Sequence, residues 1–553
     1  MPLPWYSQPR AWPRWVSLLL AAGLVLSCAR GESPPGRTEV DYSRPGKPAY
    51  GDTIVLASIG DASSMIPNIT GDSASHEIAS FIYNGLVKYD KDYNIVGDLA
   101  ESWEISPDEL SITFHLRKGV RWHDGVEFTA EDVLFTYRLM IDPRTPTPYS
   151  GDFLLVKSAQ VLGRYTFRVT YPKPFAPALM SWGMWILPKH LLEGKDVRES
   201  PLNRHPVGTG PYLFREWKTG EMILLEANPD YFEGRPYIQR ILYRIIPDSA
   251  TLFLELKAGG VDWTSLSPLQ YTRQTGDAGF QKQFRKYSYL ANAYTYLGFN
   301  LKDPRFADVR VRQALAYAID KQEIIKVVLL GLGEEATGPY KPDTWVYNPR
   351  VKRYPYDPER ARSLLAQAGW KDTDGDGILD KEGRPFRFTI LTNQGNEQRK
   401  MTAEIIQKRL SQIGIQVDIR IAEWASFINY FIKNRRFETV ILGWTTGQDP
   451  DLYDIWHSSK TLPDEFNFIS YRNPQVDKLM VQGRHTFDRR VRKACYDRIQ
   501  EILAEECPYI FLYVPYSLSV IHARFKGIQP APAGISYNFI RWYVPREQQR
   551  YHP

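Results

Sequence analysis

The chain has 553 residues, of which 69 are Lys or Arg and 63 are Asp or Glu, so its formal net charge is +6. Basic and acidic residues are interspersed rather than gathered in blocks, which gives no argument for a nucleic-acid partner. The length exceeds what one hydrophobic core usually organises, so we expect two or more lobes.

The first 27 residues have the layout of a secretory signal peptide. Two arginines precede an apolar stretch from Trp15 to Leu26, and small Ser27 comes before Cys28. The apolar stretch holds about 12 residues, fewer than the roughly 20 that a membrane-spanning helix needs. We therefore expect residues 1–27 to be removed on export.

The run Val25-Leu26-Ser27-Cys28 resembles the lipobox of bacterial lipoproteins, in which the cysteine after the cut receives a diacylglyceryl group. The resemblance implies that Cys28 anchors the mature chain to a membrane; the alternative is an ordinary secreted protein with a spare cysteine. Residues 28–50 are rich in Pro, Gly and charge, as a linker between an anchor and a folded body would be.

The first predicted element is a buried strand at Thr53–Ser58. It runs into a polar turn that contains Asp61 and Ser64, which places both at a carboxyl edge where a ligand could be contacted. Surface capping explains these two residues equally well. A strand over Ile238–Ile246 and a helix over Ser249–Lys257, closed by two glycines, are predicted further along.

A helix capped by Asp308 is predicted next, because its apolar residues recur at helical spacing. After it comes the clearest fold signal, an alternation of strands and helices. The pattern predicts strands over 386–390, 415–421 and 440–442, with helices over 397–413 and 426–433. Parallel strands joined by helices make an open α/β sheet, which binds ligands beyond the carboxyl ends of its strands.

The end of the chain is predicted to hold a helix followed by strands. Cys495 and Cys507 lie in a helical pattern that Pro508 stops; about 12 residues of helix would separate them by about 18 Å. A disulfide tolerates only about 7 Å between Cα atoms, so we expect two buried free thiols. Residues 510–525 and 536–544 have no helical period and are predicted to be strands.

Five segments in collinear order resemble the peptide-, nickel- and oligosaccharide-binding lipoproteins of ABC importers. The most specific runs from Leu99 to Asp142 and contains LRKG, HDG and TAEDV. The other four are HPVGTGPYLFREW (205–217), ANPDYFEGRPYIQRI (227–241), YLGFNLKDPRFADVRVRQALAYAIDKQEII (296–325) and GWTTGQDPDLYDIWHSS (443–459).

The resemblance implies a two-lobed, periplasmic-binding-protein-like α/β fold of type II, with a hinge between the lobes and the ligand enclosed between them. It implies a first lobe over 51–294 with an extra subdomain at about 76–190, a second lobe over 295–514, and a return to the first lobe over 515–553. It also implies a monomer outside the cytoplasm, in the periplasm or on the cell surface, that docks on a membrane permease.

In peptide-binding relatives, an aspartate after the strand that ends in Gly-Trp pairs with the free amino terminus of the peptide. Here Gly447 stands three residues after Trp444, where some relatives have that aspartate, and Asp449 is the nearest acid. Asp449 is either the amine ligand or turn scaffold, and the sequence leaves both open. The candidate ligand-binding residues in this segment are Trp444, Thr445, Gly447 and Asp449, and Trp424 just after the preceding strand is another. Tyr296 and Asn300, on the strand that enters the second lobe, are candidates for hydrogen bonds across the cleft.

Four acids in the run DTDGDGILD have the composition of a calcium loop: Asp372, Asp374, Asp376 and Asp380. The twelfth position from Asp372 is Gly383 instead of a bidentate Glu. A structural calcium site and a solvated hairpin both remain open, and no other cofactor is expected.

The rival class is an exported hydrolase. His76-Glu77 lacks the second histidine of a zinc helix, because Ser80 occupies its place, and the sequence has no Gly-x-Ser-x-Gly elbow. We therefore predict a binding protein without catalytic residues. Peptides are the expected ligand, with oligosaccharides and metal complexes as alternatives within the same class.

Overall fold

The computed structural model describes Tyr42 and residues 46–551. The predicted signal peptide, Cys28 and most of the linker lie outside the described residues, so the structure does not test the predictions made for these segments. Among the described residues, no helix has the length and apolar character needed to cross a membrane.

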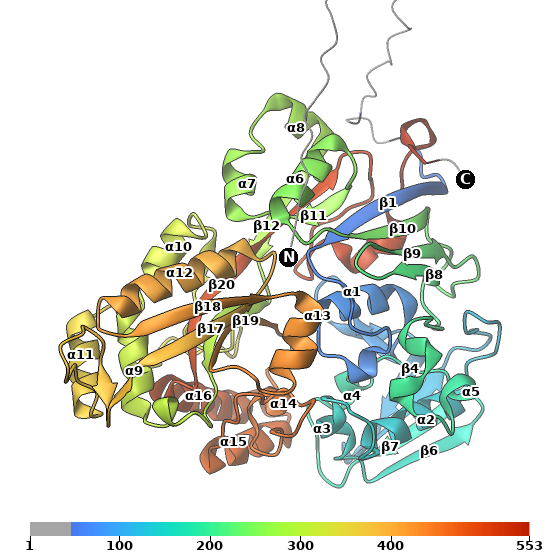
Figure 1. The fold of residues 1–553 in the computed structure, drawn as a ribbon. Coiled ribbons are helices and arrows are strands. Elements are labelled where there is room, and N and C mark those ends of the chain that lie inside the picture. Colours follow the sequence, from blue (N-terminus) through green and yellow to red (C-terminus); the bar gives the residue numbers. More distant parts are fainter. Residues whose placement is uncertain (1–41, 43–45, 552–553) are drawn as a thin grey trace, which may run out of the picture. The chain divides into compact units, whose positions relative to one another are not determined.

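A 12-stranded sheet runs through the described part of the chain (Figure 1). Its main path is β18-β17-β19-β13-β20-β11-β1-β10-β9-β8, and β12 and β14 pair with β20 off this path. The strands are β1 (Gly51–Ser58), β8 (Tyr212–Lys218), β9 (Met222–Ala227), β10 (Ile238–Ile245), β11 (Trp263–Ser265), β12 (Phe284–Leu290), β13 (Ala293–Phe299), β14 (Gly333–Glu335), β17 (Arg387–Asn393), β18 (Gln416–Ala422), β19 (Thr439–Thr445) and β20 (Tyr509–His522).

The buried apolar side chains divide the folded body into two lobes. Two core clusters contain only buried residues between 294 and 514. Three others contain only buried residues of 54–284 and 520–544. Since none of these clusters mixes the two sets, each lobe has its own core, and the first lobe takes residues from both ends of the chain.

Two adjacent segments carry the chain between the lobes. Strand β20 is shared: its first residues pair with β13 in the second lobe, and its last residues pair with β11 and β12 in the first. The second crossing is the short link between β12 and β13, where the Ala291 amide donates to the Pro515 carbonyl at 3.0 Å. Two crossings side by side are the arrangement that a hinge needs.

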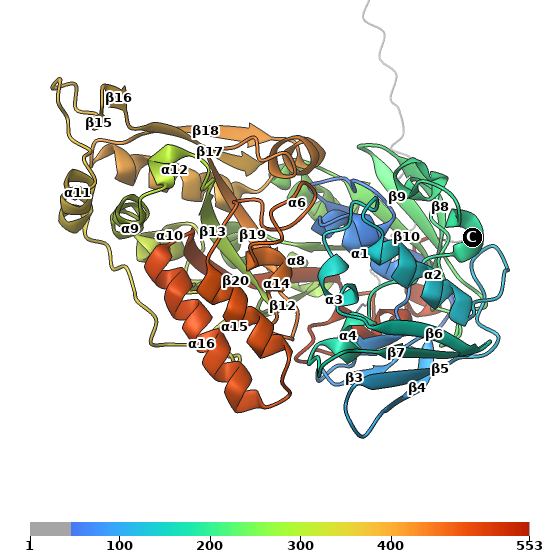
Figure 2. The same cartoon turned by 90° about the horizontal axis from the view of Figure 1, so that it is seen from below.

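The predicted strand-helix-strand unit of the second lobe is confirmed. β17 pairs in parallel with both β18 and β19, and α12 (Glu397–Ser411) forms the crossover. Ile390 packs in the core cluster that contains α12 and α9 (Val309–Ala318), whereas Leu391 packs in the cluster that contains α16 (Arg489–Glu506). Helices therefore cover both faces of this sheet (Figure 2).

The remaining helices of the second lobe are α10 (Lys321–Val327), α11 (Pro358–Gln367), α13 (Trp424–Ser426), α14 (Tyr453–Trp456) and α15 (Pro474–Arg484). The predicted helix over 426–433 is present, but residues Phe427–Ile432 form a π-helix. The acidic hairpin of this lobe is built on β15 (Asp380–Lys381) and β16 (Arg384–Pro385).

The first lobe contains a four-stranded antiparallel sheet with its own core. Its strands are β4 (Ala100–Ile105), β5 (Ser111–Leu116), β6 (Ser158–Gly163) and β7 (Thr166–Thr170), and β2 (Val87–Tyr89) pairs with β3 (Ile95–Gly97) beside it. The first-lobe helices are α1 (Ser73–Ile82), α2 (Ala130–Ile141), α3 (Ser150–Phe153), α4 (Ala178–Ser181), α5 (Lys189–Leu192), α6 (Ser249–Ala258), α7 (Pro268–Arg273) and α8 (Ala278–Gln283).

The C-terminal region corrects two sequence predictions. Residues 536–544 do not form a strand, because Ser536–Arg541 is a 3-10 helix that places Phe539 in the first-lobe core together with Trp542. Cys507 lies just after α16, as its left-handed C-cap. Both Cys495 and Cys507 are buried free thiols, as predicted.

Candidate functional site

The two lobes face each other where loop 59–72 of the first lobe meets residues 423–433 of the second. Trp424 follows β18, and its indole Nε1 donates to Asp72 Oδ1 of the first lobe at 3.5 Å. A Cβ built on Gly60 would lie 2.7 Å from the Trp424 ring. The absence of a side chain at Gly60 therefore lets the tryptophan lie directly against the first lobe. Trp424, predicted to line the ligand cleft, is here a contact between the lobes.

Trp444 reaches the first lobe through a second aromatic side chain. Its ring meets the Phe466 ring edge to face at 5.1 Å, and Phe466 meets Tyr149 of the first lobe at 5.2 Å. A Cβ on Gly71 would lie 2.4 Å from the Phe466 ring. Phe466 has no sequence motif that marks it, yet it joins the predicted tryptophan to the opposite lobe.

The predicted first-lobe residues differ in their surroundings. The carboxylate of Asp61 is buried and accepts hydrogen bonds from Trp217 Nε1 at 3.0 Å and from the Gly220 amide at 2.8 Å. These hydrogen bonds join Asp61 to residues of its own lobe. Ser64 instead lines a cavity between the lobes, and its hydroxyl donates to Asn203 Oδ1 at 2.6 Å.

Tyr296 lies on β13 and Asn300 follows it. Tyr296 is linked to Trp444 through Tyr509, whose hydroxyl accepts a hydrogen bond from Trp444 Nε1 at 3.4 Å. Tyr296 is fully buried and stacks on Tyr509 with ring centroids 3.8 Å apart. Asn300 follows the opposite end of β13, because Tyr294 is the residue paired with Trp444 and Phe299 is paired with Thr439. Six residues of strand place Asn300 about 20 Å from that pair. Its amide donates to the Phe437 carbonyl at 3.0 Å.

Asp449 is already paired within its own lobe. Nη2 of Arg492, on α16, donates to both of its carboxylate oxygens at 2.7 and 2.9 Å, and Asp449 Oδ1 accepts the Asp451 amide at 2.9 Å. These bonds give Asp449 a turn-forming role. Gly447 and Thr445 are exposed, and a Cβ on Gly447 would meet nothing within 4 Å. Space for a larger side chain at Gly447 is therefore available.

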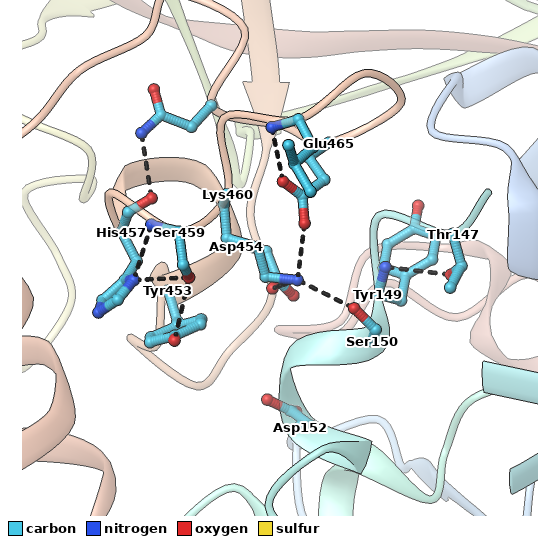
Figure 3. A network of polar contacts seen from close by, with 12 residues as sticks. Thr147, Tyr149, Ser150, Asp152, Tyr453, Asp454, His457, Ser459, Lys460 and Glu465 are labelled. Carbon is cyan, nitrogen blue, oxygen red and sulfur yellow. Dashed lines mark hydrogen bonds and ion pairs between the residues drawn. The ribbon is translucent and has the colours of Figure 1, made fainter. Parts of the chain in front are cut away.

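A buried lysine that the sequence reading missed bonds across the lobe boundary (Figure 3). Lys460 Nζ donates to Ser150 Oγ of α3 at 3.1 Å and forms ion pairs with Asp454 at 3.1 Å and Glu465 at 3.5 Å. Its side chain is 4% exposed. Burial alone would lower the pKa of Lys460, but the two carboxylates raise it overall, so the ammonium stays charged.

A second buried cation lies beside this network. Arg484, at the end of α15, pairs with Asp152 of α3 and with Asp451 of its own lobe, the latter at 2.7 Å. The Arg484 carbonyl also accepts the Ala176 amide of the first lobe at 2.8 Å. Burial raises the pKa of Asp152 to about 8 and that of Asp451 to about 6, although Arg484 acts in the opposite direction in both cases. No spacing in the sequence links these residues, because they meet only once the lobes are in place.

A polar cavity of about 280 Å³ lies between the lobes. Its first-lobe wall includes Ser63, Ser64, Thr70 and Arg198, and its second-lobe wall includes Asn429, Lys433 and Asp464. This volume is slightly below the 300–1,000 Å³ range of pockets that enclose a whole small ligand. The walls come from both lobes, so a group held here would contact both of them.

The acidic hairpin brings together three of its four acids. Carboxylate oxygens of Asp372, Asp374 and Asp376 lie within 4.8 Å of one another, and all three residues are exposed. Asp380 is not part of this group, since its carboxylate accepts the Thr373 amide and hydroxyl, each at 2.8 Å. The Asp372 carboxylate also accepts the amides of Gly375 and Gly377. The loop thus has three acids for a cation, fewer than the four that the sequence offered.

Each lobe has its own core, two adjacent antiparallel crossings join the lobes, and the interface between them is polar and aromatic. These features define a receptor of the hinged, two-lobed class. The chain belongs to the bacterial extracellular solute-binding proteins of family 5, whose middle region matches residues 94–464. It is 36% identical over 543 residues to the oligopeptide-binding protein AppA of Bacillus subtilis (strain 168), a match that covers 96% of this chain and 98% of AppA.

Solved structures give the same result. AppA from Bacillus subtilis in complex with a nonapeptide matches with a TM-score of 0.86 and 35% identity, over 90% of this chain and 100% of that one. NikZ from Campylobacter jejuni in complex with Ni(L-His) matches with a TM-score of 0.80 and 29% identity, over 89% of this chain and 99% of NikZ. DppA from Helicobacter pylori in complex with the peptide STSA matches with a TM-score of 0.80 and 30% identity, over 90% of this chain and 99% of DppA.

The predicted family and fold class are therefore confirmed. Since the relatives are solute-binding proteins, the prediction that the chain is not an enzyme is confirmed as well. An extracytoplasmic location follows from membership of an extracellular family.

Proposed function

We propose that this protein captures peptides between its two lobes and delivers them to the permease of an ABC importer. The observation that carries the proposal is the match along almost the whole chain to AppA, which is named an oligopeptide-binding protein and was solved with a nonapeptide. The interface between the lobes has the mixture of aromatic rings and polar groups that a peptide needs, since peptides are held largely through their backbone.

Native mass spectrometry of the chain from residue 46 onward tests this proposal. The expected result is a co-purified mass that dissociates on mild activation and fragments as a peptide. Titration calorimetry with a peptide library then identifies the preferred length. A co-purified metal complex or oligosaccharide, with no peptide binding, would contradict the proposal and favour the related class to which NikZ, solved with Ni(L-His), belongs.

We further propose that Cys28 carries a lipid and that the protein acts as a monomer at the membrane surface. The lipobox-like run before Cys28 supports this proposal. Labelling of cells with an alkyne-bearing fatty acid should mark the unsubstituted chain but not a Cys28→Ser variant. Equal labelling of both would place the lipid elsewhere, and labelling of neither would contradict the anchor.

A further inference from the structure

The described chain begins on a surface of the first lobe that three distant segments build. The start of β1 lies beside the last described residues (Figure 1), where Gln549 Nε2 donates to the Tyr50 carbonyl at 3.1 Å. The Tyr237 amide, just before β10, donates to the Ile540 carbonyl at 3.4 Å. We call this surface the entry face and define it by residues 46–50, 233–237 and 541–550.

Positive charge predominates on the entry face. Its cations are all exposed, and they are Lys47, Arg235, Arg541, Arg546 and Arg550. Arg541 Nη2 donates to the backbone carbonyl of Glu233 at 2.9 Å. Arg235 donates to the side-chain oxygen of Gln239. Because both acceptors are neutral, these hydrogen bonds do not cancel the charges.

The acids of the entry face compensate little of this charge. They are Glu233 and Glu547, and the Glu233 carboxylate already pairs with Lys88 at 2.6 Å. Arg550 Nη2 donates to His522 Nε2 at 2.6 Å, and burial together with neighbouring cations lowers the pKa of His522 to about 2. The imidazole is therefore neutral and leaves the charge of Arg550 in place.

An exposed aromatic side chain lies among these cations. Tyr50 is 55% exposed, stacks on Tyr237 with ring centroids 4.9 Å apart, and has the Arg235 guanidinium 5.1 Å from its own ring centroid. Tyrosine is enriched at the headgroup level of bilayers, where its ring contacts apolar groups, and guanidinium groups bind phosphate. The composition of the entry face therefore fits a surface of lipid phosphates.

The predicted anchor would hold this face close to a bilayer. Tyr42 packs on the same lobe, with its ring edge to face against His522 at 4.7 Å and the Arg550 guanidinium 6.0 Å from its ring centroid. The roughly 14 residues from Cys28 to Tyr42 span at most about 50 Å when fully extended. A lipid on Cys28 therefore keeps the entry face within that distance of the membrane.

We infer that the entry face binds the anionic headgroups of the membrane that holds the anchor. The inference rests on the proposed lipid at Cys28 and adds which face of the receptor meets the bilayer. The cations supply charge complementarity and the tether supplies proximity. Each Lys or Arg near an anionic surface strengthens binding about 5-fold, and a lipid acting together with a basic surface gives firmer membrane association than either alone.

Vesicle flotation tests the inference with the chain from residue 28 that carries Cys28→Ser and therefore no lipid at this position. One set of vesicles is phosphatidylcholine alone, and the other contains about 30% phosphatidylglycerol as the anionic lipid. The chain should float with the anionic vesicles and stay behind with the neutral ones. Binding should fall as the salt concentration rises, because salt screens exposed charges.

Two triple variants locate the contact. Lys47→Gln, Arg235→Gln and Arg546→Gln together should lower the partition coefficient about 100-fold, which is about 5-fold for each cation. The melting temperature and the peptide affinity should not change, because all three side chains are exposed. The matched control carries Lys326→Gln, Arg384→Gln and Arg387→Gln, at exposed positions of the second lobe, and should keep full binding.

Absence of binding to the anionic vesicles, or equal losses in the two triple variants, would overturn the membrane contact and leave the anchor intact. Retention of the chain by immobilised polyglutamate, without binding to the anionic vesicles, would assign the entry face to an acidic polymer and also overturn the inference. Absence of alkyne labelling at Cys28 would overturn the anchor, and the contact that rests on it.

Discussion

Arg484 of the second lobe and Asp152 of the first form an ion pair across the lobe boundary, and the Arg484 side chain is only 2% exposed. Arg484 also pairs with Asp451, so one buried cation serves a carboxylate from each lobe. Beside it, Lys460 bonds Ser150 of the same first-lobe helix. Two buried cations of the second lobe therefore contact α3.

Substitution at these positions should have unequal effects on stability. Arg484→Met leaves Asp152 and Asp451 buried without a cation and should lower the free energy of unfolding by about 3–5 kcal/mol. Asp152→Asn leaves Arg484 paired with Asp451 and should cost less, about 1–2 kcal/mol. Urea unfolding at pH 9, above the pKa of about 8 that burial gives Asp152, measures both values. Equal losses of unfolding free energy in the two variants would show that the pair of Arg484 with Asp451 contributes nothing to stability.

Ligand affinity should rise as the pH falls from about 8 to 6. With the lobes in contact, burial raises the pKa of Asp152 to about 8, and the nearby Asp451, Asp454 and Asp449 add to this while Arg484 acts against it. The closed form then binds a proton that an open, hydrated Asp152 does not bind, so protonation favours closure between these two pKa values. Calorimetry at pH 6 and pH 8 measures the effect, which Asp152→Asn should diminish. An affinity that instead rises as the pH rises from 6 to 8 would contradict a role for Asp152 protonation in closure.

Asp449→Asn should lower the affinity for free-amine peptides and for N-acetylated peptides by the same factor. The carboxylate is already bonded by Arg492, so its loss disturbs the turn rather than a bond to the ligand. Binding of both peptides to the variant measures this. A loss of about 1.5–3 kcal/mol confined to the free-amine peptide would assign the carboxylate to the ligand after all.

Calcium should have no effect on the protein. The acids that come together are exposed and accept amides of their own loop, and Asp380 is bonded to Thr373. We expect calorimetric titration of calcium into chelator-treated protein to give only the heat of dilution, with an unchanged melting temperature. Saturable heat would instead establish a structural calcium site at the hairpin.

Local sequence patterns were sufficient for much of the fold. Asp308 caps its helix as predicted, and the alternating residues of 415–421 form a strand parallel to its neighbour. The run 536–544 was misread because its aromatic and branched residues favour strands, while Phe539 and Trp542 are spaced as one helical turn and are buried together.

The interface between the lobes was predictable only in part. Trp424 and Trp444 were found because strand ends can be read from hydrophobic periodicity. Lys460, Arg484 and Phe466 could not be found in this way, since a charge or ring that meets a partner 300 residues away leaves no local spacing. Asn300 lies at the end of β13 away from Trp444 because β13 and β19 are antiparallel, and the direction of this pairing cannot be read from local sequence.

Solution scattering with and without bound peptide tests the central claim, that the two lobes close over a ligand. Peptide should reduce the radius of gyration of the unsubstituted protein and of Gly276→Ala, where an added Cβ meets nothing within 4 Å. Gly60→Ala should reduce this contraction, because its Cβ would lie 2.7 Å from the Trp424 ring. A radius of gyration that peptide leaves unchanged, while calorimetry shows the peptide bound, would contradict closure.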